Sequence, residues 1–252
     1  MRREQAPTSP CAAPRGSVFL PGAHKRPDKW LNRAMTDILI ADDHPLFRAA
    51  LRQAVEASFS EASIHEADSL AALEQIGQQG QHFDVILLDL HMPGTHGFSG
   101  LIYLREQYRK VPLVVISATE DVDVIQRAIH FGADGFIPKS ASVDTMTEAM
   151  RQIMDGKQWL PEKARRAMPP TLPDHTAMKE RITSLTPQQF RVMGMLMEGM
   201  QNKVIAYELD VSEATIKAHM TAIFRKLGVR NRTQAVLALK DLAIDAQGVE
   251  GN

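Results

Sequence analysis

The chain has 252 residues, which is enough for two modest domains or one large one. Its one cysteine, Cys11, excludes an intramolecular disulfide and a metal cluster built from cysteines, as is typical of a reduced cytoplasmic protein. No apolar run approaches the roughly 20 residues of a membrane-spanning helix, so we expect no membrane partner. The net charge of −1 hides two opposite regions: residues 36–156 hold 18 acidic and 8 basic side chains, and residues 181–240 hold 4 acidic and 9 basic ones. This asymmetry suggests two functions, of which the basic one suits contact with phosphates.

We expect a disordered extension at residues 1–35 and a disordered tail at residues 246–252. The extension contains five prolines and several basic residues, without a periodic pattern of apolar residues. Its apolar stretch "SVFL" is too short for the core of a signal peptide. Met35 stands just before the first predicted strand, so a second hypothesis is that translation begins at Met35 and not at Met1.

From residue 36 to residue 156, short apolar segments alternate five times with helix-like segments. The apolar, β-branched segments predict buried strands, and the longer segments between them predict helices. This alternation predicts an α/β domain with a parallel sheet that helices cover on both faces. The predicted strands are residues 37–41, 63–67, 84–89, 112–117 and 135–138, and the predicted helices are residues 45–57, 69–79, 98–108, 122–131 and 143–155.

Residues 157–182 contain four prolines and predict a linker, with some helix possible on either side of the prolines. Residues 183–245 predict a second domain of four helices. Thr186, Pro187 and Gln189 have the pattern of a capping box at the start of the first helix, which should end near residue 199. The other three helices are predicted at residues 203–209, 212–227 and 232–242, the second of them capped by Ser212 and closed by Gly228.

In a parallel α/β sheet, ligands bind beyond the carboxyl ends of the strands. Five polar residues follow predicted strands at that edge, namely Asp42, Asp43, Asp89, Ser117 and Lys139. Each has an ordinary structural explanation when taken alone, because Asp and Ser commonly form turns and a single Lys is commonly solvated. Together they bring three carboxylates close to one another, which repel unless a cation lies between them. Oxygen ligands of this kind suit Mg²⁺, and Lys139 could bind an anion.

The motifs "DD" (residues 42–43), "DLHMPG" (89–94) and "SA" (117–118) and the lysine at 139 occur in this order at the strand ends. With them, residues 36–156 resemble the receiver domain of bacterial response regulators. The resemblance implies a flavodoxin-like fold with a parallel five-stranded sheet of order 2-1-3-4-5. It implies that Asp89 accepts a phosphoryl group, and that Mg²⁺ is held by Asp43, Asp89 and the backbone carbonyl of His91, with Asp42 assisting. It also implies that Ser117 and Lys139 contact phosphoryl oxygens, and that Phe136 is the aromatic residue that changes rotamer on activation.

Other residues near these motifs allow further expectations. Gly94 and Gly97 permit a sharp loop, from which we expect Asp89 to be exposed. Many receivers have a proline directly after the lysine, whereas here Pro138 precedes Lys139. We assign the scattered histidines to surface or packing roles, with a proton relay as the alternative for His96; they are His44, His65, His82, His96 and His130.

The predicted helix 212–227 has two contrasting faces. Ile216, Met220, Ile223 and Leu227 follow the spacing of a buried stripe. The opposite face carries Lys217, Ala218, Thr221 and Arg225. A short helix and a tight turn precede this helix, which predicts a helix-turn-helix. From charge alone, the alternative is a helical bundle with a solvated basic face.

Residues 185–236 resemble the LuxR/NarL-type DNA-binding domain over its whole length. The matching positions include Leu185-Thr186, Gly199, Asn202-Lys203, Val211-Ser212, Thr215-Ile216-Lys217 and Lys226-Leu227. The resemblance implies base contacts in the major groove by Lys217, Ala218 and Thr221, with Arg225 on the same face. It implies phosphate contacts by Thr215, Asn202, Lys203, Lys226 and Arg230. The family often has Glu where this chain has Gln189, so we expect an ion pair within the domain to be missing.

The two resemblances together predict a transcriptional response regulator of a two-component system, located in the cytoplasm and not an enzyme. A sensor histidine kinase would phosphorylate Asp89, which would shift the domain arrangement and dimerisation and expose the helix of Lys217. The expected partners are double-stranded promoter DNA, the kinase, RNA polymerase and a second copy of the chain. One alternative is a phosphorylation-independent transcription factor whose receiver is a platform for protein interactions. Another is a phosphohydrolase, but His91 stands where such an enzyme commonly needs a second aspartate.

Overall fold

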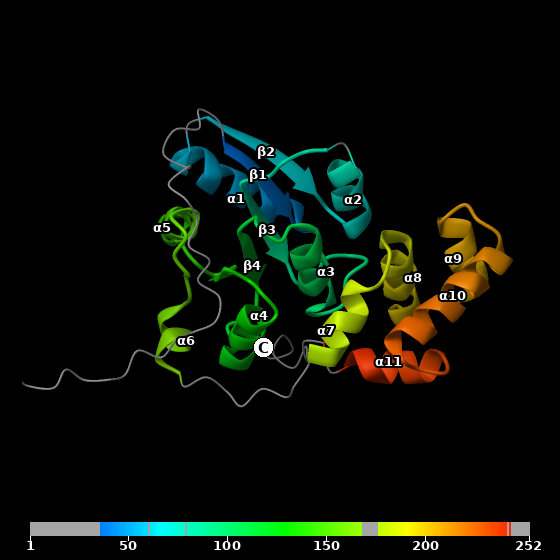
Figure 1. The fold of residues 1–252 in the computed structure, drawn as a ribbon. Helices are drawn as coiled ribbons and strands as arrows, with labels where there is room; N and C mark the ends of the chain where they lie inside the picture. Colours follow the sequence, from blue (N-terminus) through cyan, green and yellow to red (C-terminus); the bar gives the residue numbers. More distant parts are fainter. Residues whose placement is uncertain (1–35, 60, 79, 168–175, 241, 243–252) are drawn as a thin grey trace, which may run out of the picture.

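The computed structural model describes residues 36–59, 61–78, 80–167, 176–240 and 242, which form an α/β domain followed by a helical domain (Figure 1). The expectations for residues 1–35 and 246–252, including a start at Met35, lie outside the described residues. Within the described ranges, no helix is long and apolar enough to cross a membrane.

The first domain is built on a parallel sheet of order β2-β1-β3-β4-β5, as the resemblance implied. Its strands are β1 (Thr36–Ala41), β2 (Ala62–Ala67), β3 (Val85–Asp89), β4 (Leu113–Ser117) and β5 (Gly135–Pro138). β3, β4 and β5 are buried along their whole length, because helices cover both faces of the sheet. The registers pair Asp89 with Ile116 and Ser117 with Pro138, so the carboxyl ends of these strands lie at one edge.

The five helices of this domain divide between the two faces of the sheet (Figure 1). α1 (Pro45–Ser58) and α5 (Val143–Met154) pack together on one face. α2 (Leu70–Gln78), α3 (Ser99–Gln107) and α4 (Val122–His130) cover the other. Successive strand residues point to opposite faces of the sheet. Ile38 and Ile40 therefore lie in the core on the side of α1 and α5, and Leu39 lies in the core on the side of α2, α3 and α4.

The segment predicted as a linker contains two helices, α6 (Glu162–Arg166) and α7 (Thr176–Thr183). α7 packs against α3 of the first domain and α10 of the second. Its residue Ile182 is fully buried, and Arg181 Nη1 donates a hydrogen bond to the carbonyl of Leu227 at 3.0 Å. α7 is therefore part of the folded structure, although a linker was predicted there.

The second domain is the predicted four-helix helix-turn-helix, with α8 (Pro187–Met197), α9 (Asn202–Glu208), α10 (Glu213–Leu227) and α11 (Arg232–Lys240). The capping box is present, because the Thr186 hydroxyl accepts from the N–H of Gln189 and the Gln189 side chain accepts from the N–H of Thr186. Ser212 caps α10, and Gly228 ends it in the left-handed conformation with φ of +70°. The predicted stripe is buried; it consists of Ile216, Met220, Ile223 and Leu227.

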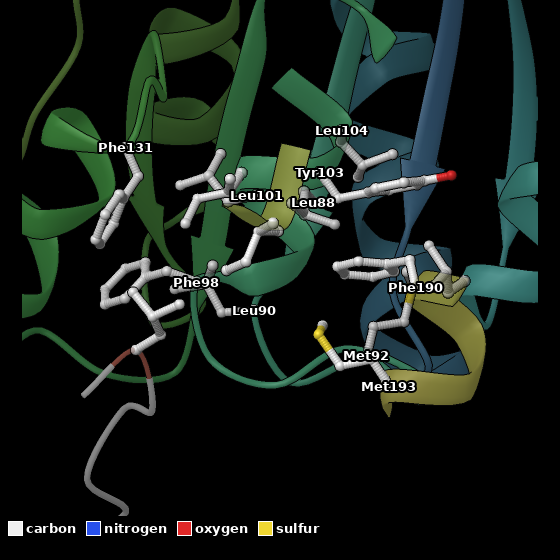
Figure 2. Close-up of a cluster of buried hydrophobic side chains, with 14 of the residues drawn as sticks. Leu88, Leu90, Met92, Phe98, Leu101, Tyr103, Leu104, Phe131, Phe190 and Met193 are labelled. Atoms are coloured by element: carbon white, nitrogen blue, oxygen red, sulfur yellow. The ribbon is translucent and has the colours of Figure 1, made fainter. Parts of the chain in front are cut away.

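The two domains share one continuous hydrophobic core, shown in Figure 2. The rings of Tyr103 in α3 and Phe190 in α8 stack with their centroids 4.2 Å apart and their planes 15° from parallel. His96 Nε2 donates a hydrogen bond to the carbonyl of Gly194 at 2.9 Å. A Cβ atom at Gly194 would lie only 2.6 Å from the carbonyl oxygen of Gly94, so this close approach of two backbones needs a glycine.

Candidate metal centre and nucleic-acid interface

The five polar residues predicted at the strand ends lie together at the carboxyl edge of the sheet. Asp42 and Asp43 follow β1, Asp89 ends β3, Ser117 ends β4 and Lys139 follows β5. Carboxylate oxygens of the three aspartates lie within 4.8 Å of one another. Parallel strands all end at this edge, which is why residues far apart in the sequence become neighbours.

Lys139 supplies the positive charge among these carboxylates. Its Nζ atom lies 2.7 Å from Asp42 Oδ2 and 2.8 Å from Asp89 Oδ2. Burial, the largest single influence, lowers the pKa of Lys139, but its hydrogen bonds and its charge attraction to Asp42 and Asp89 together raise the pKa above the ordinary value. The Phe47 ring, whose centroid lies 4.8 Å from Nζ, adds a cation–π contact. The ammonium is therefore charged at neutral pH.

The donor set fits a divalent cation. Three carboxylates and one ammonium carry a net charge of −2, which one divalent cation balances. Carboxylate oxygens are the ligands that Mg²⁺ prefers, and an acidic cluster of this kind is typical of Mg²⁺ sites in receivers. The cluster comprises Asp42, Asp43 and Asp89, with His44 beside them.

Asp89 is buried, and the expectation that the glycine loop exposes it is wrong. Gly94 and Gly97 do have positive φ angles of +83° and +53°. The Asp89 residue is nevertheless only 2% exposed. The ammonium of Lys139 contacts Asp89 Oδ2, and His44 Nδ1 lies 3.8 Å from the same oxygen, so residues from two other strand ends cover the carboxylate. Any molecule that approaches Asp89 from solvent must displace part of this cover.

His44 belongs to the cluster at the site, although only a surface or packing role was expected for it. Its side chain is 63% exposed, yet Nδ1 lies 2.7 Å from Asp43 Oδ1 and 3.5 Å from Asp42 Oδ1. A surface role alone therefore does not describe His44. The sequence could have indicated this position, because His44 directly follows the "DD" motif and the chain is still at the edge of the sheet there.

The remaining residues of the candidate site lie in β4, in β5 and in the loop after β3. Ser117 and Phe136 are fully buried, and the Ser117 hydroxyl accepts a hydrogen bond from the N–H of Thr119 at 3.4 Å. The N–H of His91 donates to Asp89 Oδ1 at 3.2 Å. This last bond ties the loop after β3 to the carboxylate itself.

The face of α10 opposite the buried stripe is exposed, as predicted. Lys217, Ala218, Thr221 and Arg225 all face solvent. Lys217 Nζ lies 3.0 Å from Glu213 Oε1, one helical turn away, and the Lys217 side chain stays 66% exposed. The packing of the two domains does not cover this face, so phosphorylation is not needed to expose it. The expectation that phosphorylation exposes this face is therefore wrong.

The residues expected to contact phosphates differ in their surroundings. Lys203, Thr215 and Arg230 are exposed, and Asn202 is half-buried. Lys226 Nζ donates to the carbonyl of Ser184 at 2.6 Å and to Gln189 Oε1 at 2.7 Å. The hydrogen bond from Lys226 thus takes the place of the ion pair expected to be missing at Gln189. A phosphate contact by Lys226 would compete with these two bonds.

Two family models match the chain: the response regulator receiver domain at residues 38–151, and the bacterial regulatory proteins of the luxR family at residues 183–239. Over 217 residues the chain is 42% identical to the "Glycerol metabolism activator" of Pseudomonas putida, covering 84% of this chain and 98% of that relative. It is 30% identical to the "Nitrate/nitrite response regulator protein NarL" of Escherichia coli K12, covering 82% and 95%. A solved structure of the RcsB response regulator of Salmonella typhimurium is 22% identical, with a TM-score of 0.48, and covers 81% of this chain and 98% of that chain. The chain therefore belongs to the two-component response regulators in which a receiver domain is joined to a LuxR-type DNA-binding domain, and it is a transcriptional regulator and not an enzyme.

Proposed function

We propose that phosphorylation of Asp89 by a sensor histidine kinase controls promoter binding by this chain. The observation that supports this most directly is the meeting of Asp89, Lys139 and two further aspartates at one sheet edge. In the transfer, an oxygen of Asp89 bonds to phosphorus while the bond from phosphorus to the kinase histidine breaks, leaving its electron pair on nitrogen. Bound Mg²⁺, held by Asp43, Asp89 and the carbonyl of His91 with Asp42 assisting, would supply positive charge for the phosphoryl oxygens.

Within this proposal, the other site residues stabilise the charge of the transferred group. The ammonium of Lys139 would pair with one phosphoryl oxygen, and the hydroxyl of Ser117 would donate to another. Phe136 is fully buried in β5, where it pairs with Val115, two residues before Ser117 in the neighbouring strand. A change of its rotamer would follow movement of the Ser117 hydroxyl. The small Ala118 next to Ser117 leaves space for the group.

The test of the acceptor is the variant Asp89→Asn. With acetyl phosphate or a cognate kinase, the wild type should take up one phosphoryl group and Asp89→Asn should take up none. Asp121→Asn is a matched control, because Asp121 follows β4 near the same edge and Asn keeps its helix-capping role. Label on Asp89→Asn at the wild-type level would show that Asp89 is not the acceptor.

We further propose that phosphorylation weakens the packing of the helical domain on the receiver. The loop that begins at Asp89 is bonded to the carboxylate through the N–H of His91. The same loop carries Gly94 and His96, which contact Gly194 of α8. A phosphoryl group on Asp89 would alter the hydrogen bond between the N–H of His91 and the carboxylate. This change would shift the loop that contacts α8.

Release of the helical domain would allow it to reorient. The base-reading face is already exposed, so the effect of release is on how two copies of this domain can be placed on two half-sites. We propose a homodimer on promoter DNA, with RNA polymerase as the further partner and activation of transcription as the outcome, since a relative is named an activator. As a DNA-binding regulator, it is proposed to act in the cytoplasm. Equal affinity for promoter DNA with and without acetyl phosphate would instead favour a receiver that is only an interaction platform.

A further inference from the structure

We propose that His44 is a fourth protein ligand of the divalent cation at the receiver site, and that it shifts the preference of the site from Mg²⁺ toward transition metals such as Co²⁺. This inference rests on the proposed cation site but not on phosphoryl transfer. His44 would supply an imidazole nitrogen, whereas the other protein ligands of the cation all supply oxygen atoms.

The positions of the donor atoms are compatible with a single coordination sphere. His44 Nδ1 lies 2.7 Å from Asp43 Oδ1, 3.5 Å from Asp42 Oδ1 and 3.8 Å from Asp89 Oδ2. In an octahedron with ligands about 2.1 Å from the metal, adjacent donors are about 3.0 Å apart and opposite donors about 4.2 Å. The three distances span a similar range. Lys139 Nζ lies 3.5 Å from the same nitrogen, so a shift of the ammonium would place the nitrogen beside a cation that the carboxylates hold.

The backbone holds His44 in this place. Its N–H donates to Asp42 Oδ1 at 2.8 Å, and Pro45 follows at the first position of α1, where its fixed φ limits the chain. Arg48 Nη1 donates to the carbonyl of Asp42 at 2.6 Å and fixes the turn from its other side. These contacts fix the backbone of His44 beside the carboxylates, from where its partly exposed imidazole reaches Asp43 Oδ1.

His91 offers a natural comparison. It also belongs to a loop at the site, and its side chain is 47% exposed. Its Nδ1 atom comes within 3.9 Å of Asp89 Oδ1, and it is not part of the cluster that could hold a metal ion. The role expected of His91 uses its backbone carbonyl, which a change of side chain leaves in place.

The chemical consequence is a change in metal preference. Mg²⁺ is a hard cation that takes oxygen ligands, whereas imidazole nitrogen favours later divalent metals over Mg²⁺. The carboxylates serve both kinds of cation. His44 therefore adds affinity for Co²⁺, Ni²⁺ or Zn²⁺ that it does not add for Mg²⁺.

The experiment uses the full chain and Co²⁺ as the probe. A histidine bound to Co²⁺ through Nδ1 carries an Nε2–H proton whose NMR signal is shifted far downfield and disappears in D₂O. We expect this signal in the wild type and in His91→Gln, and its loss in His44→Gln. By calorimetric titration, His44→Gln should raise the Kd for Co²⁺ about 10-fold or more, since even residues that only support a metal ligand have effects of that size. The Kd for Mg²⁺ should change far less.

Each other outcome overturns the inference. The signal could persist unchanged in His44→Gln, or be absent from a wild type that binds Co²⁺ at the carboxylates. His44→Gln could also weaken Mg²⁺ and Co²⁺ equally, which would show an electrostatic or structural role. None of these outcomes affects the proposed phosphorylation, which the Asp89→Asn experiment tests separately.

Discussion

Replacing Gly194 by Ala tests whether the contact between α8 and the loop after β3 holds the two domains together. Gly194 lies inside α8, where alanine favours the helix by about 1 kcal/mol relative to glycine. The substitution should therefore strengthen α8 itself. Any weakening of domain packing then comes from the interface and not from damage to the helix.

The structure sets the size of the perturbation. The new Cβ atom would lie 2.6 Å from the carbonyl oxygen of Gly94 and 3.2 Å from its carbonyl carbon. Both are backbone atoms, so no side chain can rotate away, and one domain must move from the other by several tenths of an ångström. Overpacking of this kind costs about 1–3 kcal/mol, which lowers the ratio of closed to open molecules about 5- to 150-fold.

The assay measures the distance between the domains directly. After replacement of Cys11 by Ser, spin labels at the exposed positions Gln75 in α2 and Gln201 before α9 report this distance by pulsed EPR. Gly194→Ala should shift the distances toward longer and broader distributions without a phosphodonor. It should also raise affinity for promoter DNA in the same state.

Gly77→Ala is the matched control. Gly77 is also inside a helix, α2, and its new Cβ atom would meet only the hydroxyl end of the Tyr108 side chain, within the receiver. This control should keep the wild-type distances. If Gly194→Ala also keeps them, the glycine contact does not hold the domains together, and the proposed route from Asp89 to α8 fails.

Four other changes test further parts of the account. Burial raises the pKa of Glu74, at the interface, above its ordinary value of 4.5, partly offset by Tyr103 and Arg191. When the domains close, Glu74 should take up a proton at pH values between 4.5 and its raised pKa. Domain packing, measured by pulsed EPR, should therefore weaken as the pH rises through that window. Glu74→Gln should remove this pH dependence. Lys217→Ala should weaken promoter binding by about 1–3 kcal/mol and relax base preference at one position in a site-selection experiment. Lys203→Ala should weaken binding to all sequences alike and lower the slope of its salt dependence by about 1. Thr186→Ala should lower the free energy of unfolding of the helical domain by about 1 kcal/mol in urea, because the capping box loses its hydroxyl.

The sheet and its polar edge could be predicted because they depend on local patterns. Each strand shows itself as a short apolar run, and the rule that ligands bind at the carboxyl edge then brings Asp89 and Lys139 together. The helix-turn-helix follows in the same way from the buried stripe of α10 and from its caps. In both cases the deciding signal lies within a few consecutive residues.

The contacts between distant segments could not be predicted in this way. Tyr103 and Phe190 each look like ordinary core residues of their own domain, and no local pattern pairs Gly94 with Gly194. The burial of Asp89 was missed for the same reason, since its cover comes from Lys139 and His44 at other strand ends. The glycine loop has the expected conformation, but loop conformation does not decide exposure.

The central claim is that a phosphoryl group on Asp89 loosens the packing of the helical domain on the receiver. Pulsed EPR between labels at Gln75 and Gln201, recorded before and after treatment with acetyl phosphate and Mg²⁺, tests it most directly. The account predicts longer and broader distances in the treated wild type, and unchanged distances in Asp89→Asn. Unchanged distances in a wild type shown to be fully phosphorylated would contradict it.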